Sequence, residues 1–138
     1  MSSGYLVDTC AAIWLTQRAE VAPEARLALK RAWRDQVSVC VSAVTAWEMA
    51  MLVSRGRMTE TKEPLRWYRD FIRESRLEEQ PVTAEIYVAS CFLPQPVHND
   101  PTDRIIIATA REHDLTIITR DRAILSYGAL GHVKVLAC

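Results

Sequence analysis

The chain has 138 residues, 49% hydrophobic and 25% charged, a composition that excludes an intrinsically disordered protein and predicts one globular domain over residues 1–138. Its seventeen basic and seventeen acidic side chains cancel, so net charge neither favours nor excludes a nucleic-acid partner. The first residues do not resemble a secretory leader, and no apolar run approaches the roughly 18 residues of a membrane span. We therefore expect a soluble protein without membrane contact.

The cysteines are scattered along the chain, at Cys10, Cys40, Cys91 and Cys138. They include no C-x-x-C pair and have no histidine at zinc-ligand spacing. Three of them lie inside apolar segments, where a reduced thiol behaves as a small hydrophobic side chain. This distribution predicts a reducing, cytoplasmic location.

Hydrophobic patterning predicts strands alternating with helices along the whole chain. The expected strands cover 5–7, 37–41, 115–119 and 132–136. The expected helices cover 10–18, 24–35, 43–54, 64–78 and 83–92, with a further helix beginning in the stretch NDPTDRIIIATA (99–110) and a short turn after Asp121. Such alternation predicts an α/β fold, a three-layer α/β/α sandwich around a mostly parallel sheet.

The segment 64–78 has the clearest amphipathic pattern. Its apolar face carries Trp67, Tyr68, Phe71 and Ile72, and these aromatics, together with Trp47, are expected in the core. Its opposite face carries Arg66, Arg69, Arg73 and Arg76, interleaved with acidic residues. That interleaving predicts a solvated helix face and not a track for RNA.

Four acidic residues, far apart in sequence, are expected near the ends of strands. Asp8 ends the first strand, Asp121 follows the 115–119 strand, Asp103 opens the preceding helix, and Glu48 lies in the helix after the second strand. In open α/β sheets the ligand crevice lies beyond the carboxyl ends of the strands, so these side chains could share one edge. Clustered carboxylates repel one another and attract a cation, and their hard oxygens suit Mg²⁺ or Mn²⁺.

Each acid also has a purely structural interpretation. Asp100 before Pro101 fits a helix N-cap, with Asp103 then at the third helical position. Thr45 and Glu48 have the spacing of a capping box, and Asp121 could cap a short turn. Asp8 is the hardest to explain structurally, because an ionised group directly after a buried strand needs a partner.

The segments LVDT (6–9), SAVTAWEMA (42–50), DPTDRIIIATA (100–110) and TIITRD (116–121) occur in an order and spacing that resemble the PIN-domain family, most closely its VapC-type toxin ribonucleases. The resemblance covers essentially the whole chain and departs from the family at Cys10 and Thr102. It implies a Mg²⁺- or Mn²⁺-dependent endoribonuclease of a type II toxin–antitoxin system, acting on RNA. It also implies a homodimer that a VapB-type antitoxin neutralises.

By this resemblance, the residues expected to be both catalytic and metal-binding are Asp8, Glu48, Asp103 and Asp121. The expected substrate-binding residues are Thr9 and Thr119, at the family's small hydroxyl positions, and the neighbouring basic residues Arg104, Arg120 and Arg122. The histidines are expected in loops and on the surface, with His98 close to the predicted site. The alternative is a non-catalytic PIN-like module that binds RNA or protein.

Overall fold

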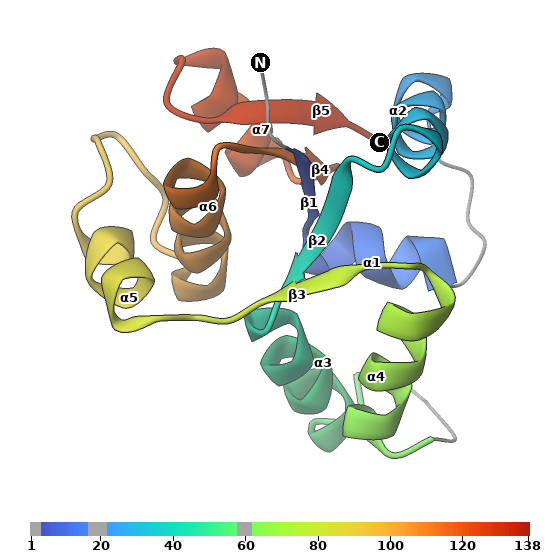
Figure 1. Ribbon diagram of the computed structural model, residues 1–138. Helices are drawn as coiled ribbons and strands as arrows, with labels where there is room; N and C mark the ends of the chain where they lie inside the picture. The colour runs from blue at the N-terminus through green and yellow to red at the C-terminus, as the bar shows by residue number, and fades with distance from the viewer. Residues whose placement is uncertain (1–3, 17–21, 58–61) are drawn as a thin grey trace.

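The computed structural model describes residues 4–16, 22–57 and 62–138. Its strands are β1 (Gly4–Val7), β2 (Ser38–Ser42), β3 (Glu78–Gln80), β4 (Leu115–Thr119) and β5 (Lys134–Ala137). Its helices are α1 (Thr9–Thr16), α2 (Pro23–Arg34), α3 (Val44–Ser54), α4 (Pro64–Glu74), α5 (Ala84–Cys91), α6 (Pro101–His113) and α7 (Arg122–Ala129). The strands form one parallel sheet in the order β3-β2-β1-β4-β5 (Figure 1).

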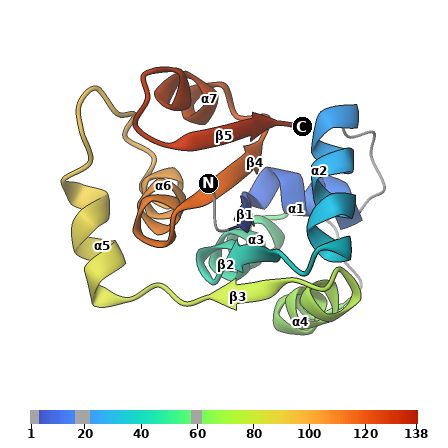
Figure 2. The ribbon, with the colours of Figure 1, turned by 45° about the horizontal axis from the view of Figure 1, so that its top comes forward.

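Helices cover both faces of this sheet, as Figures 1 and 2 show, which confirms the predicted α/β/α sandwich. Successive residues of β1 face opposite layers, so that Leu6 packs with α5, α6 and α7 while Val7 packs with α1, α2 and α4. Helix α3 contributes to both layers, through Val44 on one side and Met49 on the other. The two cores hold the strands from both faces, as is usual for a buried parallel sheet.

The strand register sets the level of the residues that follow the strands. Val7 of the central strand pairs with Val41 of β2 and with Ile118 of β4. The residues one step further, Asp8 and Thr119, therefore lie at the same edge of the sheet. This edge is the carboxyl end, where a ligand crevice is expected.

Three expected elements differ from the structure. The helix expected over 64–78 ends at Glu74, and 78–80 form β3, a short polar edge strand whose sequence lacks the apolar alternation that marks a strand. The turn expected after Asp121 is the eight-residue helix α7, and the last strand covers 134–137 instead of 132–136. Residues 17 and 18 of the first expected helix lie outside the described residues.

The amphipathic helix α4 is confirmed in part. Trp67, Tyr68 and Phe71 are buried, whereas Trp47, which was expected in the core, is 53% exposed. Arg69 and Arg73 of the opposite face are exposed and pair with Glu79 and Asp70, as a solvated face predicts. Cys40 is buried, Cys138 is partly buried, and Cys10 and Cys91 are exposed, so a place in an apolar segment does not by itself bury a cysteine in this fold.

Within residues 4–16, 22–57 and 62–138, no helix combines the length and the apolar character needed to cross a membrane.

Candidate active site and metal centre

Asp8 lies at the centre of the candidate site, directly after β1, with only 3% of its surface exposed. Its Oδ1 accepts a hydrogen bond from the backbone N–H of Ala11 at 2.7 Å. Its Oδ2 accepts one from the hydroxyl of Thr119, which in turn accepts from the backbone N–H of Asp121 at 2.9 Å. Thr119 therefore links two of the predicted acids across adjacent segments of the sheet edge.

Glu48 reaches the same region from α3. Its Oε1 accepts a hydrogen bond of 2.6 Å from the hydroxyl of Thr9, which also lies 3.0 Å from the hydroxyl of Thr45. The capping-box interpretation of Thr45 and Glu48 is wrong, because α3 begins at Val44 with Ala43 as its N-cap and Thr45 is fully buried. Glu48 is thus positioned by a residue 39 places earlier in the chain and not by its own helix terminus.

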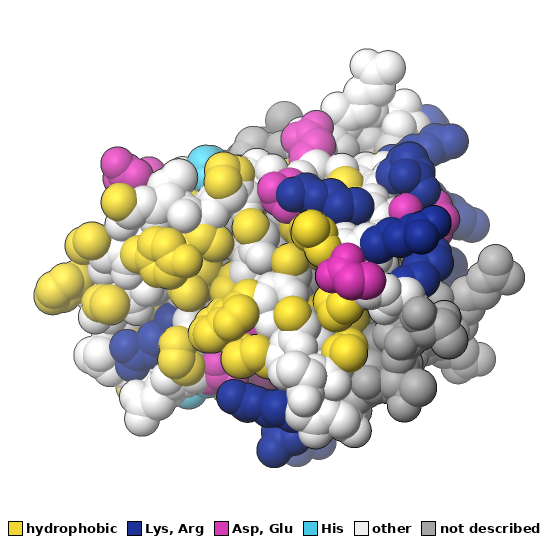
Figure 3. All heavy atoms as spheres, turned by 90° about the horizontal axis from the view of Figure 1, so that it is seen from below, with side chains coloured by type: hydrophobic (Ala, Val, Ile, Leu, Met, Phe, Trp, Pro, Cys, Tyr) yellow, Lys and Arg dark blue, Asp and Glu magenta, His cyan; other side chains and the backbone are white. Residues whose placement is uncertain are grey.

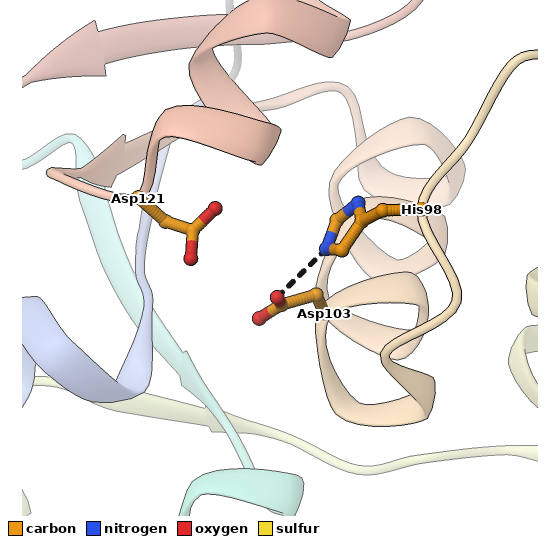
Figure 4. Close-up of side chains that lie close together, drawn as sticks. All are labelled: His98, Asp103 and Asp121. Atoms are coloured by element: carbon orange, nitrogen blue, oxygen red, sulfur yellow. Dashed lines mark hydrogen bonds and ion pairs between the residues drawn. The ribbon is translucent and has the colours of Figure 1, made fainter.

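The start of α6 confirms the capping role of Asp100. Its Oδ1 accepts from the N–H groups of Thr102 and Asp103 at 3.0 and 3.4 Å, and from the buried hydroxyl of Thr102 at 2.7 Å. Asp100 therefore caps α6, and the side chain of Asp103 does not take part in the cap. Oδ2 of Asp103 lies 2.8 Å from Nε2 of His98, which belongs to the loop between α5 and α6 (Figure 4).

Asp121 is the N-cap of α7, where its side chain accepts a hydrogen bond from the N–H of Ile124 at 3.0 Å. Its carboxylate also faces the pair formed by His98 and Asp103, as Figure 4 shows. Ligand atoms of these three side chains lie within 4.8 Å of one another. A helix cap and a place in the cluster are therefore compatible for this residue.

The carboxylates perturb one another electrostatically. Burial raises the pKa of Asp8 to about 6, against hydrogen bonds from Thr119 and Ala11 that lower it, and the charges of Asp121 and Glu48 raise it further. Burial likewise raises the pKa of Asp103 to about 6, with a lowering contribution from His98. The pKa of Glu48 is raised overall, because the effect of burial exceeds the lowering effect of the Thr9 hydrogen bond.

The thiol of Cys10 lies near enough to all four acids for their charges to act on it. This exposed residue follows Asp8 by two positions in α1. Partial burial of the thiol, followed by the charges of Asp8, Glu48, Asp103 and Asp121, raises the pKa of Cys10 to about 11. The structure thus brings together the four carboxylates predicted from the sequence.

This donor set fits a divalent cation. The side chains offer carboxylate oxygens with one imidazole nitrogen at the rim, and hard oxygens are the ligands that Mg²⁺ and Mn²⁺ prefer. Burial, with a smaller contribution from neighbouring carboxylates, raises the pKa of Asp8 and Asp103, and a bound cation would stabilise their ionised forms.

The predicted basic residues lie around the cluster with different partners. Nε of Arg104 donates to the carbonyl of His98 at 2.7 Å. Arg120 lies over the ring of Trp14 at 3.9 Å and donates to the carbonyl of Cys138 at 2.7 Å. Arg122 is exposed in the first turn of α7. Their role in substrate binding stays a prediction.

Two contributors were not identified from the sequence. His98 was placed in a loop near the site, but its contact with Asp103 depends on the fold of the segment 94–100. Thr45 was interpreted as a cap, although it lies buried against Thr9. A signal was present for His98 alone, because it stands five residues before Asp103, across a helix N-terminus.

A PIN-domain family model matches residues 5–130. Over 122 residues the chain is 26% identical to Ribonuclease VapC22 of Mycobacterium tuberculosis, a match that covers 88% of this chain and 90% of that protein.

Solved structures show the same fold at low identity. The VapBC2 complex of Rickettsia felis, bound to a DNA fragment from its promoter, matches with a TM-score of 0.69 at 15% identity, covering 98% of both chains. The DNA-bound VapBC of Salmonella typhimurium matches with 0.68 at 17% identity over 99% of this chain and 98% of that one. The FitAcB structure from Neisseria gonorrhoeae matches with 0.59 at 23% identity over 96% of both. With the family model spanning most of its length, the chain belongs to the PIN-domain family.

Proposed function

We propose that this protein is a Mg²⁺- or Mn²⁺-dependent endoribonuclease, the VapC-type toxin of a type II toxin–antitoxin pair, formed by a single PIN domain over residues 1–138. The observation that carries the proposal is the complete set of carboxylates, Asp8, Glu48, Asp103 and Asp121, gathered around Cys10 at the carboxyl edge of the sheet. The similarity to Ribonuclease VapC22 supports the ribonuclease class.

The residues divide into holding and orienting roles. Asp8 and Asp103 would hold the cation, because Asp8 is buried, Asp103 is partly buried, and burial raises the pKa of both carboxyl groups. Asp121 would complete that site or hold a second ion. Thr119 fixes the rotamer of Asp8, and Thr9 fixes Glu48, so that Glu48 is positioned to orient a water toward a phosphate.

A bound Mg²⁺ or Mn²⁺ supplies Lewis acidity toward a phosphate oxygen and lowers the pKa of a water ligand. The protein contributes the position of the groups. Glu48 accepts the Thr9 hydrogen bond through Oε1, and its carboxylate would orient the attacking water. Arg122 and Arg104 flank the acids in sequence and are the proposed contacts of the RNA backbone, as are Thr9, Thr119 and Arg120.

The alternative function is a PIN-like module that binds RNA or protein without cleaving it. Such a module does not require carboxylates at this edge whose pKa values are raised, mainly by burial, because ionising them costs folding free energy. A module that only binds would also not require the hydrogen bonds from Thr119 and Thr9 that orient the Asp8 and Glu48 carboxylates. The geometry therefore favours catalysis.

Incubation of the purified protein with end-labelled total RNA tests the proposal. Cleavage is expected with Mg²⁺ or Mn²⁺ and not with EDTA, and it should fall to background in Asp8→Asn, Asp103→Asn and Glu48→Gln. Asp114→Asn is the matched control, because Asp114 ends α6 at the opposite end and pairs with Lys134. Equal cleavage by Asp103→Asn and the wild type would exclude the carboxylate site as the source of activity.

Two partners follow from the proposed class. The first is a VapB-type antitoxin, which is consistent with the VapBC complexes among the structural matches. The second is another copy of the chain. An exposed apolar groove of about 730 Å³, between α3, α5 and the start of α6, is the proposed dimer surface. Hydrophobic side chains gather broadly on the face seen in Figure 3.

The groove is lined in part by Trp47 and Tyr87, which are 53% and 54% exposed, and by Cys91. Large exposed apolar patches of this kind mark interaction sites more often than solvated surface. The proposed location is the cytoplasm, consistent with cysteines that are all unpaired.

A further inference from the structure

We propose that His98 is a nitrogen ligand of the cation and shifts the site's preference from Mg²⁺ toward Mn²⁺. The inference deepens the proposed nuclease function and rests on it. Its starting point is that the described cluster of ligand atoms contains an imidazole and two carboxylates, from His98, Asp103 and Asp121 (Figure 4).

The spacing of the three groups suits one ion. Neighbouring ligands of an octahedral ion at about 2.1 Å are about 3.0 Å apart, and opposite ligands about 4.2 Å apart. Nε2 of His98 and Oδ2 of Asp103 form a hydrogen bond of 2.8 Å, a separation close to that of two neighbouring ligands, and a cation bound by both atoms would displace the proton between them. All three ligand atoms lie within 4.8 Å of one another, so a small rotation of side chains brings them around a common centre.

The backbone of His98 is held in place by the helix that carries Asp103. Arg104, the next residue of α6, donates from Nε to the His98 carbonyl at 2.7 Å and from a terminal nitrogen to Oδ1 of Asn99 at 3.3 Å. These two hydrogen bonds tie the end of the loop to the first turn of α6. The side chain of His98 is 27% exposed and that of Asp103 is 17% exposed, so both are partly shielded from water.

This arrangement gives Arg104 a structural role in addition to its proposed contact with the RNA backbone. Its two hydrogen bonds hold the loop in place, which lowers the entropic cost of placing the imidazole beside Asp103 when a cation binds. A rigid supporting contact of this kind is what a precise ligand position requires.

The chemical consequence follows from the nature of the donors. A site built from carboxylates alone suits Mg²⁺, which prefers hard oxygen ligands and near-ideal geometry. An imidazole nitrogen is a softer donor that favours first-row transition ions over Mg²⁺. Of the two ions proposed for this site, Mn²⁺ accepts an imidazole nitrogen more readily than Mg²⁺ does, so the cluster should bind Mn²⁺ more tightly than Mg²⁺.

Pulsed electron spin resonance of the protein loaded with one equivalent of Mn²⁺ tests this directly. A ¹⁴N modulation from a coordinated imidazole is expected in the wild type and in His113→Gln, a control on the exposed end of α6. It should be lost in His98→Gln. Calorimetry should show the Mn²⁺ affinity of His98→Gln reduced about 10-fold or more, with the Mg²⁺ affinity changed much less.

An isotope-labelling experiment tests the same point without any substitution. Wild-type protein with ¹⁵N-histidine should replace the ¹⁴N modulation by the ¹⁵N pattern. Mn²⁺ binding with no histidine modulation, or an unchanged modulation in His98→Gln, would overturn the inference and leave the nuclease proposal intact. Absence of Mn²⁺ and Mg²⁺ binding in the wild type would instead overturn the proposed function itself.

Discussion

The hydroxyl of Thr119 joins the buried carboxylate of Asp8 to the backbone of the neighbouring acid, since it donates to Asp8 and accepts from the N–H of Asp121. Thr119 is fully buried. The orientation of Asp8 therefore depends on one hydroxyl contributed by a strand 111 residues further along the chain.

Replacing Thr119 by Val keeps the shape and removes both hydrogen bonds. We expect the free energy of unfolding to fall by about 1–3 kcal/mol, because a buried carboxylate and a buried N–H lose a partner. Urea unfolding measures the change. Thr119→Ser, which retains the hydroxyl, should recover most of it, and equal losses in Ser and Val variants would indicate packing as the cause.

Metal-free stability should depend on pH through Asp8. Its pKa in the folded protein, about 6, lies above the ordinary value of 3.8, so the folded state binds the proton more tightly than the unfolded state. This stabilisation is fully present below pH 3.8 and is lost as pH rises through 6. Two pKa units correspond to about 3 kcal/mol as an upper limit.

The measurement is the difference in unfolding free energy between wild type and Asp8→Asn in EDTA, from acid to neutral pH. The difference should fall with rising pH and become constant above about pH 7. Acids with lowered pKa values, such as Asp35 and Asp70, act in the opposite direction but equally in both proteins. A difference that rises with pH would contradict the burial effect on Asp8.

Asp103→Asn should stabilise the metal-free protein at pH 7.5 while weakening its response to Mn²⁺. At that pH the wild-type carboxylate is ionised at a cost, because its pKa is about 6. Loss of a charge in the first turn of α6 opposes the gain by about 0.3–1 kcal/mol, which is the smaller effect.

Thermal unfolding with and without Mn²⁺ measures both results. The wild type should gain the larger increase in melting temperature, because the ion binds only the folded state. Asp114→Asn is again the control and should respond as the wild type does. Identical Mn²⁺ responses in Asp103→Asn and the wild type would leave Asp103 with a purely helical role.

Gly128 allows α7 to approach β5. A Cβ atom there would lie 2.4 Å from Cγ2 of Val135. Gly128→Ala should therefore destabilise the protein by about 1–3 kcal/mol, despite the better helix propensity of alanine. Combining it with Val135→Ala should cost less than the sum of the two single changes in urea unfolding, and simple additivity would rule out the overlap.

The proposed dimer surface predicts that Trp47→Arg is monomeric. Light scattering should give 15.6 kDa for this variant and twice that mass for the wild type at micromolar concentration. Leu65→Arg is the matched control, since Leu65 is 54% exposed but does not line the groove. A monomeric wild type would refute the dimer, and a dimeric Trp47→Arg would place its interface elsewhere.

The start of α6 could be predicted from the sequence because its determinants are local. Asp100 and Pro101 are adjacent to the N–H groups that they cap or replace. The meeting of Asp8 and Asp121 could also be predicted, since both follow strands of a parallel sheet and such ends share an edge. These inferences need only topology and no side-chain detail.

The remainder depends on contacts that sequence patterns do not encode. The strand β3 is polar and is specified by pairing with β2, through partners such as Cys40 and Glu78. Trp47 faces outward on a helix whose apolar residues surround it on all sides, so no clear stripe identified its exposed position. The contact between His98 and Asp103 could not be predicted, because it depends on the path of the loop between α5 and α6.

The order of strands in the sheet has a consequence for synthesis of the protein. β1, at the centre, is made first, yet one of its two neighbours is β4, which is made more than a hundred residues later. A nascent chain that ends before residue 115 has Asp8, Glu48 and Asp103 but neither Thr119 nor Asp121, and its central strand is unpaired on one side. The complete carboxylate cluster therefore arises only late in translation, and under the proposed function a nascent chain would gain nuclease activity only after β4 and the start of α7 have been made.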